Sequence, residues 1–321
     1  MELIEDIDKI KEPYTRAVVT IGNFDGVHRG HQTLFKKVMD RAREISGTSV
    51  AITFEPHPLK VLGKNGPPLI TRKDQKIELI TASGIEKVIC IPFTESFAAI
   101  SAQEFVTGLL IDKIGMHTII VGPDYSFGRD REGDIDFLVK AGKKEGFDVV
   151  VPDWFCIPKV SGSTGDERIS STMIRNIVME GRVEDAPRYL GRYYQIRGKV
   201  IKGRERGGSR LGFPTANIKL HDELCPKMGV YAVTVETVRG THTGVANIGY
   251  SPTFDDNIFT IEVHILDFCH DIYGTRIRVN MVSRLRDEKK FSGIAELSAR
   301  IASDIEMARE IFKTIQIFPD N

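Results

Sequence analysis

The feature that most constrains this chain is a change in how its apolar runs are spaced. Between residues 17 and 151, short runs rich in β-branched residues alternate with helical stretches, whereas after about residue 186 strand-like runs are separated only by turns. Parallel strands need long crossover connections and antiparallel strands need only short ones, so the two patterns require different folds. We therefore predict two domains, residues 1–185 and 186–321, joined near Gly181–Arg192.

The first half predicts a doubly wound α/β fold. Its apolar runs are residues 17–21, 49–54, 87–91, 118–121 and 148–151. Continuously apolar strands are typical of a parallel sheet that is buried on both faces, and their alternation with helices indicates an open, Rossmann-like sheet.

Three helices of this half have recognisable signals. An apolar stripe at helical spacing covers residues 34–45. Thr71 with Asp74, and Ser101 with Glu104, resemble capping boxes, in which the first side chain accepts a hydrogen bond from the backbone of the second. We therefore expect helices to begin at these two places.

The second half predicts an antiparallel barrel or sandwich. Its strand-like runs are Tyr194–Ile201, Val230–Val238, Ile258–Leu266 and Arg276–Val282. Short strands joined by turns are typical of such folds. An apolar stripe from Ile294 to Phe312 predicts one long amphipathic helix after the last strand.

The composition narrows the class of function. Lys and Arg number 44 and Asp and Glu number 44, and the resulting zero net charge argues against a protein that coats nucleic acid or a membrane surface. The apolar runs are far shorter than the ~20 residues of a membrane-spanning helix. The four cysteines stand far apart without a CxxC pair, so we expect reduced thiols and a cytoplasmic protein.

A glycine-framed histidine pair follows the first strand directly, in Gly22–His31. A helix N-terminus at the carboxyl end of a parallel strand offers free N–H groups to an anion, and the glycines let the backbone approach a phosphate. His28 and His31 share one helix face and can stabilise charge that builds on a phosphate. A zinc site is an alternative that lacks a third ligand nearby. The H-x-G-H element resembles that of nucleotidyltransferases, which transfer AMP from ATP.

A second phosphate-binding element is indicated by Ile169–Arg175. Hydroxyl groups at a helix start either cap the helix or bind phosphate oxygens, and Arg175 follows one turn later. The alternative is a plain helix cap with a solvated arginine.

In the second half, the segment Leu211–Asn217 predicts a binding site for a hard cation. Pro214 makes the turn rigid, and the Thr215 hydroxyl and Asn217 amide are oxygen donors that suit Mg²⁺. The glycine- and arginine-rich run Gly203–Arg210 precedes this turn and is suited to cover phosphates. The alternative is an ordinary polar turn beside a solvated loop.

A carboxylate on a strand completes the candidates. Residues 261–268 alternate in strand fashion, so that Glu262 and His264 face one way and the apolar residues face the other. Glu262 could accept the proton of an attacking hydroxyl group, or it could simply lie on the solvent face.

Together these motifs are similar to those of the prokaryotic bifunctional riboflavin kinase/FAD synthetase family. The resemblance runs from Val18 to about Ala308. The motifs that carry it are Gly22–His31, Thr53–Pro58, Gly122–Gly128, Ile169–Arg175, Gly212–Asn217, Gly229–Tyr231, Ala246–Gly249, Pro252–Phe254, Glu262–Phe268, Tyr273–Gly274 and Leu285–Arg286.

The resemblance implies two reactions. A six-stranded β-barrel in the second half would phosphorylate riboflavin with ATP and Mg²⁺, and the first half would transfer AMP from a second ATP to FMN, giving FAD and pyrophosphate. The implied catalytic residues are His28, His31, Arg175 and Glu262. The implied nucleotide-binding residues are Gly22, Phe24, Asp25, Gly26, Gly30, Ser170, Ser171, Thr172, Gly212 and Pro214. The implied flavin-binding residues are Phe54, His57, Pro58, Asp124, Phe127 and Arg286, and the implied metal ligands are Thr215 and Asn217.

The expected partners are therefore small molecules: riboflavin, FMN and ATP, with Mg²⁺ or another divalent ion. We expect no nucleic-acid or membrane partner, and a monomer or weak oligomer. Arg300 departs from the family, in which many members carry glutamine there. Two alternatives are an enzyme that retains one activity, and a flavin-nucleotide sensor or RNA-binding regulator. Such a regulator would be expected to have lost His28, His31 or Glu262, and all three are present.

Overall fold

The computed structural model describes residues 2–63, 66–158, 166–201, 213–220, 223–250, 259–289 and 291–315. By its internal contacts the chain divides into two units, Met1–Ser171 and Thr172–Asn321. The predicted domain boundary between residues 185 and 186 lies further along the chain. The helices between the two positions are tied to the second unit, where the Lys227 N–H donates to the Val178 carbonyl.

The first unit is built on a six-stranded sheet in the order β1-β4-β3-β2-β5-β6, and all its strand pairs are parallel. The strands are β1 Glu2–Ile4, β2 Ala17–Ile21, β3 Ser49–Glu55, β4 Lys87–Pro92, β5 Met116–Ile120 and β6 Asp148–Val150. The predicted doubly wound sheet is thus confirmed. Sequence reasoning missed β1, because a three-residue run that begins with Glu2 and is followed by Glu5 and Asp6 carries no strand signal.

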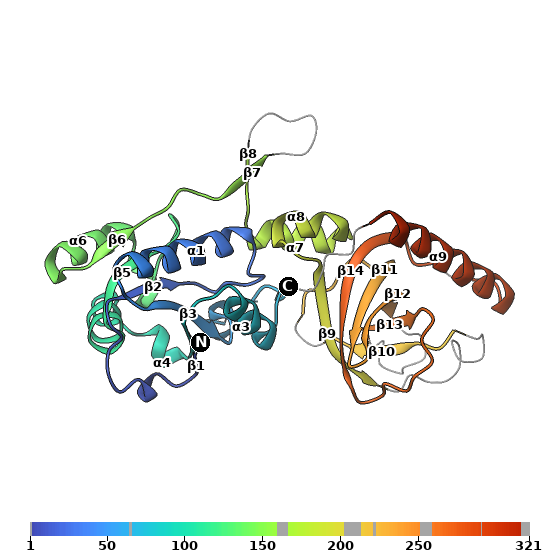
Figure 1. Ribbon diagram of the computed structural model, residues 1–321, viewed down its shortest axis with the longest axis horizontal. Helices are drawn as coiled ribbons and strands as arrows, with labels where there is room; N and C mark the ends of the chain where they lie inside the picture. Colours follow the sequence, from blue (N-terminus) through green and yellow to red (C-terminus); the bar gives the residue numbers. More distant parts are fainter. Residues whose placement is uncertain are drawn as a thin grey trace. The chain divides into compact units, whose positions relative to one another are not determined.

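Helices cover both faces of this sheet (Figure 1). They are α1 Arg29–Glu44, α2 Pro58–Val61, α3 Lys73–Ala82, α4 Glu95–Ala98, α5 Ala102–Glu104, the π-helix η2 Phe105–Lys113 and α6 Ile135–Glu145, with short 3₁₀ turns at Ile7–Lys9 and Arg129–Arg131. Because side chains alternate along a strand, Val18 faces Phe35 and Val38 of α1, in one apolar cluster.

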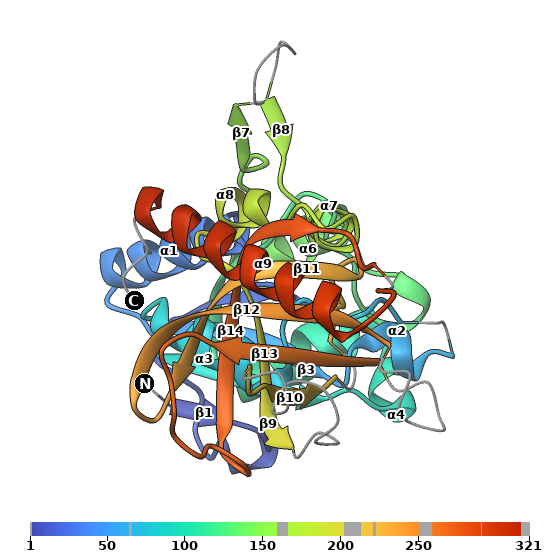
Figure 2. The ribbon, with the colours of Figure 1, turned by 90° about the vertical axis from the view of Figure 1, so that its right-hand side faces the viewer.

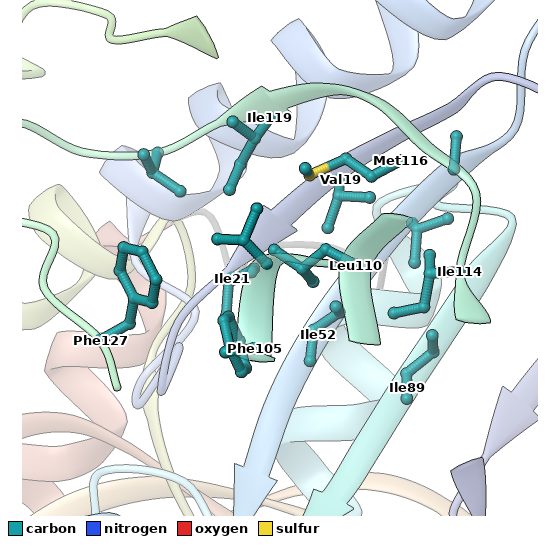
Figure 3. Close-up of a cluster of buried hydrophobic side chains, with 14 of the residues drawn as sticks. Val19, Ile21, Ile52, Ile89, Phe105, Leu110, Ile114, Met116, Ile119 and Phe127 are labelled. Atoms are coloured by element: carbon teal, nitrogen blue, oxygen red, sulfur yellow. The ribbon is translucent and has the colours of Figure 1, made fainter. Parts of the chain in front are cut away.

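The other face of the sheet holds the larger core. Val19 and Ile21 of β2 belong to a second cluster together with Phe105 and Leu110 of η2, and Figure 3 shows these side chains converging. Ile52 of β3 joins them from the neighbouring strand. The two clusters explain why the central strands β2, β3, β4 and β5 are mostly apolar, since both of their faces are buried.

One of the two predicted capping boxes is wrong. Ser101 caps its helix as predicted, and its hydroxyl accepts the Glu104 N–H at 3.2 Å. Helix α3 instead begins after Arg72 without a side-chain cap. The Thr71 hydroxyl is used elsewhere, because it accepts the Gly26 N–H at 2.9 Å. A contact across 45 residues therefore replaces the local one.

A two-stranded hairpin and three short helical segments follow the sheet. The hairpin consists of β7 Cys156–Pro158 and β8 Asp166–Arg168, which pair antiparallel. The helical segments are α7 Ser171–Met179, η4 Val183–Asp185 and α8 Ala186–Leu190.

The second unit is a closed antiparallel barrel in the order β10-β13-β12-β11-β14-β9. Its strands are β9 Tyr194–Ile201, β10 Ala216–Lys219, β11 Gly229–Thr237, β12 Gly240–Tyr250, β13 Phe259–Ile265 and β14 Arg276–Arg286. The implied six-stranded barrel is confirmed. Residue patterns alone had missed β10 and β12, which are short or rich in glycine and polar residues.

The long helix α9, Ile294–Thr314, packs against the outside of the barrel (Figure 2). Ile305 and Ala308 of α9 form an apolar cluster with Val230 and Val245 of the strands. The predicted stripe begins too early, since Ile294 is 73% exposed and takes no part in this cluster. Ile294 lies in the first turn of α9, and this turn extends beyond the apolar surface of the barrel that the rest of the helix covers.

Candidate active sites

The loop between β2 and α1 is held in a sharply turned conformation. Phe24, Gly26 and Val27 all have positive φ angles of 47°, 84° and 40°, a region that is costly for residues with side chains. Asp25 stabilises this backbone from inside: its buried carboxylate accepts the N–H groups of Ile70 and Thr71 at 3.1 and 3.0 Å. Asp25 and Gly26 are thus tied to residues 70–71, just before helix α3.

The two histidines of this loop stack on each other at the start of α1. Their ring centroids are 3.6 Å apart and the rings are nearly parallel, at 17°. His28 is the N-cap residue, and its Nδ1 accepts the His31 backbone N–H at 3.4 Å. An alanine in place of Gly30 would bring a Cβ to 3.2 Å from the His28 ring, so glycine leaves the space in which that ring lies.

The hydrogen bond to His28 and the burial of His31 favour neutral rings in this arrangement. Because His28 Nδ1 is an acceptor, the proton of the neutral ring is on Nε2. Burial, together with the neighbouring His28, holds the pKa of His31 well below its usual value. His31 Nδ1 is buried and has no hydrogen-bond partner within the described part of the chain. The pair can therefore act by donating hydrogen bonds, rather than as two positive charges.

The predicted second phosphate-binding element contacts this loop through Ser171. The Ser171 hydroxyl donates to the Asp25 carbonyl at 2.9 Å. Ser170 directly precedes it, Thr172 is exposed, and Arg175, one turn into α7, is 9% exposed. Thr71, which sequence reasoning assigned only to a helix cap, belongs to the same group through its bonds to Asp25 and Gly26.

The predicted flavin-binding residues of the first unit lie at the carboxyl ends of β3 and β5 or just after them. His57 is buried and caps α2, since its Nδ1 accepts the Leu59 N–H at 3.2 Å, and Pro58 is the first residue of that helix. Phe54 stacks edge-on against Phe93, with ring centroids 5.6 Å apart. Phe127 is only 8% exposed and belongs to the hydrophobic core. Asp124 is exposed.

In the barrel, Glu262 stands between two amide side chains. Strand pairing places Asn217 of β10 opposite Glu262 on one side and Asn247 of β12 opposite it on the other. The three side chains share the outer face, because their alternating neighbours, such as Ile261 and Val263, are fully buried. Burial raises the pKa of Glu262. Asn247 is a further candidate site residue. It belongs to the motif Ala246–Gly249, but the sequence analysis assigned it no role.

The turn that carries Thr215 is fixed to the strand that carries Glu262. His264, two residues along β13 on the same face as Glu262, donates from Nδ1 to the Pro214 carbonyl at 2.9 Å. The Phe213 ring stands edge-on to His264 at 5.6 Å. Phe213 and His264 also line a cavity of about 480 Å³ with Leu266, Ile305, Glu306 and Arg309, within the usual size range for small-molecule sites. His264 thus holds the turn that carries Thr215. The strand pattern had indicated only that His264 shares a face with Glu262.

Other predicted residues are placed differently or not at all. The Arg286 guanidinium is engaged by Asp304 of α9 at 2.7–3.0 Å. Gly212, the loop Gly203–Arg210 and the motif Pro252–Phe254 lie outside the described residues.

Comparison with known families agrees with this division into two sites. A family model described as FAD synthetase matches residues 10–173, and one described as riboflavin kinase matches residues 190–312. The chain belongs to the bifunctional riboflavin kinase/FMN adenylyltransferase family. The family resemblance predicted from the motifs is confirmed, and this family order places the adenylyltransferase in the first half and the kinase in the second.

Individual relatives support the assignment over nearly the full length. The bifunctional riboflavin kinase/FMN adenylyltransferase of Escherichia coli strain K12 is 38% identical over 97% of this chain and 98% of its own. The enzyme of the same name from Pseudomonas fluorescens is 35% identical, with 97% and 98% covered. A crystal structure of a Streptococcus pneumoniae protein called macrolide-efflux protein superposes with a TM-score of 0.83, at 32% identity, over 96% of this chain and 98% of that one. Within the described ranges, no helix has the length and apolar character to span a membrane.

Proposed function

We propose that the first unit transfers AMP to FMN through the paired histidines of the β2–α1 loop. The FMN phosphate oxygen attacks the α-phosphorus of ATP, a new P–O bond forms, and the bond to pyrophosphate breaks. No proton has to be removed from a phosphate that is already ionised, so the protein's task is alignment and charge stabilisation. The stacked neutral rings of His28 and His31 are the observation that carries this assignment, because they supply hydrogen-bond donors at the N-terminus of α1.

For the second unit we propose a kinase reaction with Glu262 as the base. The ribityl hydroxyl of riboflavin attacks the γ-phosphorus of ATP, its proton passes to the Glu262 carboxylate, and ADP leaves. Burial supports this role, since a raised pKa makes the carboxylate a better proton acceptor. A cavity lined by Phe213 and His264 lies on the same face of β13, and His264 is two residues along the strand from Glu262. We propose this cavity as a place for part of a substrate whose reacting hydroxyl reaches Glu262.

The donor set beside Glu262 fits Mg²⁺. The Thr215 hydroxyl and the buried Asn217 amide are neutral, hard oxygen donors, and no cluster of three His, Cys, Asp or Glu side chains suited to a softer metal is found in the described part of the barrel. When bound, Mg²⁺ would neutralise charge on the ATP phosphates. Thr215 is fixed through the neighbouring Pro214 carbonyl, which His264 holds.

We further propose that the domain boundary of the two activities lies near residue 185, that the enzyme works in the cytoplasm, and that it is a monomer or weak oligomer. The free thiols of all four cysteines support a reducing compartment.

A crossed pair of variants tests the assignment of the two sites. His28→Ala should lower FAD formation from FMN and ATP by about 10²–10³ while FMN formation from riboflavin continues. Glu262→Ala should lower FMN formation by about 10²–10⁴ while FAD formation from supplied FMN continues. Separation of the flavins by chromatography measures both. If each variant lowers both reactions equally, the assignment of residues to sites is wrong.

A further inference from the structure

A buried lysine of α3 contacts the end of β3, where the predicted flavin-binding residues begin. Lys76 is 6% exposed. Its Nζ donates to the Phe54 carbonyl at 2.9 Å and lies 3.5 Å from the Glu55 carboxylate. An ammonium group loses its hydration when it is buried, so it needs acceptors of this kind to replace water. Lys76 belongs to none of the motifs that carry the family resemblance.

The Phe54 carbonyl points past the end of the neighbouring strand β2. Carbonyl groups two residues apart on a strand point to the same side, and the Ile52 carbonyl accepts the Gly22 N–H at 3.0 Å, directly after β2. The strand β2 ends at Ile21, so Lys76 supplies to Phe54 the donor that a longer β2 would have supplied. A backbone carbonyl is costly to leave unpaired in the interior, and this hydrogen bond therefore fixes the end of β3.

The Phe54 ring is fixed separately from its backbone. The ring packs against Phe93 and Phe97, with centroids 5.6 and 5.8 Å apart, next to the core cluster that contains η2. Helix α3 lies on the other face of the sheet, since its Ile80 belongs to the cluster with α1. Contacts from both faces thus fix Phe54, and with it the direction in which the chain continues toward His57.

A different residue fixes the histidine turn. The Thr71 hydroxyl accepts the Gly26 N–H and donates to the Asp25 carboxylate, whereas Lys76, five residues later, contacts β3. The two buried side chains thus fix two different parts of the proposed adenylyltransferase site, the loop that carries the histidines and the predicted flavin-binding end of β3. Loss of the Lys76 contact should therefore affect one substrate and not both.

We propose that Lys76 is a positioning residue for FMN in the adenylyltransferase site. Its ammonium group fixes the end of β3, so that Phe54, His57 and Pro58 are in place before FMN binds. The proposal rests on the function proposed above for the first unit. Its consequence is that removal of the ammonium group weakens the binding of FMN and leaves the binding of ATP unchanged.

The kinetics of FAD formation from supplied FMN and ATP separate these two effects in the full-length enzyme. Lys76→Met removes the ammonium group and keeps an unbranched side chain. Its KM for FMN should rise about tenfold, equivalent to about 1.4 kcal/mol, because the flavin-binding end of β3 is no longer fixed. Its KM for ATP should equal that of wild type. FMN formation from riboflavin, measured in the same preparation, should also be unchanged.

A second lysine of the same helix is the matched control. Lys73 is 46% exposed and is paired with one carboxylate, that of Glu5 at 2.6 Å, and Lys73→Met should leave both KM values unchanged. If Lys76→Met does not fold, Lys76→Gln takes its place with the same expectation. An unchanged KM for FMN would overturn the proposal. An equal rise in the KM for FMN and for ATP would also overturn it, since a general loss of structure affects both. Failure of the proposed function would show instead as undiminished FAD formation in His28→Ala.

Discussion

The carboxylate of Asp304 and the guanidinium of Arg286 form a buried fork that joins α9 to the end of β14. Arg286 Nε donates to both carboxylate oxygens at 3.0 Å, and its Nη2 donates to Oδ2 at 2.7 Å. The Asp304 side chain is 2% exposed, and Arg300 adds a further contact at 3.2 Å. Arg300, which departs from many family members, thus has a structural partner. The predicted flavin-binding role of Arg286 stays a prediction.

Loss of the Asp304 carboxylate should destabilise the barrel. Asp304→Ala would leave the Arg286 guanidinium, 15% exposed, without its acceptor, at a cost of about 3 kcal/mol, or roughly 6–12 °C in Tm. Calorimetric unfolding measures the shift. Glu310→Gln on the same helix, which breaks the exposed pair with Lys313, should leave the Tm within error. A Tm shift of similar size in both variants would show that the Arg286–Asp304 pair stabilises the protein no more than an exposed ion pair does.

Gly30→Ala should separate activity from stability. The added methyl group would press on the His28 ring at 3.2 Å, and we expect about a tenfold loss of FAD formation, since catalysis is sensitive to sub-ångström misplacement. The fold should not lose stability, because alanine is a better helix former than glycine. Gly108→Ala in η2, where an added Cβ meets nothing within 4 Å, is the matched control and should be fully active. Wild-type FAD formation by the Gly30 variant would contradict the role of the ring position.

The lowered pKa of His31 predicts how FAD formation and stability respond to acid. The ring stays neutral in the folded enzyme, so titration of His31 should not reduce FAD formation as the pH falls through its ordinary pKa of about 6.5. The unfolded chain binds this proton more readily, so stability is lost as the pH falls through that value, by up to about 1.4 kcal/mol per pH unit. Melting curves from pH 8 to pH 5 should therefore fall less steeply for His31→Gln than for wild type.

A matched histidine provides the control for this measurement. His270 is exposed, and His270→Gln should melt in parallel with the wild-type enzyme across the same pH range. If His31→Gln also runs parallel to wild type, His31 is not kept neutral by burial.

Glu262→Gln should gain stability while it loses the kinase reaction. The folded-state pKa of Glu262 is raised by burial, so the folded protein is penalised for the charged form, and this penalty grows as the pH rises through the raised pKa. The glutamine carries no charge, and its Tm should exceed that of wild type at pH 7 but not at pH 4. FMN formation, measured alongside, should fall by about 10²–10⁴. An unchanged Tm difference between the two pH values would contradict the assignment of the penalty to Glu262.

Much of the fold was predictable because it depends on local patterns. Buried parallel strands are apolar throughout, and β2 Ala17–Ile21 and β9 Tyr194–Ile201 have the predicted bounds. The strands that were missed have sequences that favour neither helix nor strand. β1 has only three residues. β12 begins Gly240-Thr241-His242-Thr243-Gly244, and it is extended because it pairs with β11 on one side and β13 on the other.

The candidate sites were predictable in residue type but not in arrangement. The motifs identify His28, His31 and Glu262, but not the stacking of the rings or the amides on each side of the carboxylate, which arise from tertiary packing. Thr71 shows the reason: a residue that looks locally like a helix cap is used by a loop 45 residues away. No spacing rule contains that contact.

The register of β13 makes the barrel intolerant of insertions there. Glu262 stands outward while Ile261 and Val263 fill the interior, so one residue added before position 262 would turn the carboxylate into the hydrophobic centre and expose the aliphatic side chains. The same slip would damage folding and chemistry together. Length variation among natural variants of this chain should therefore collect in the turns and be absent from this strand.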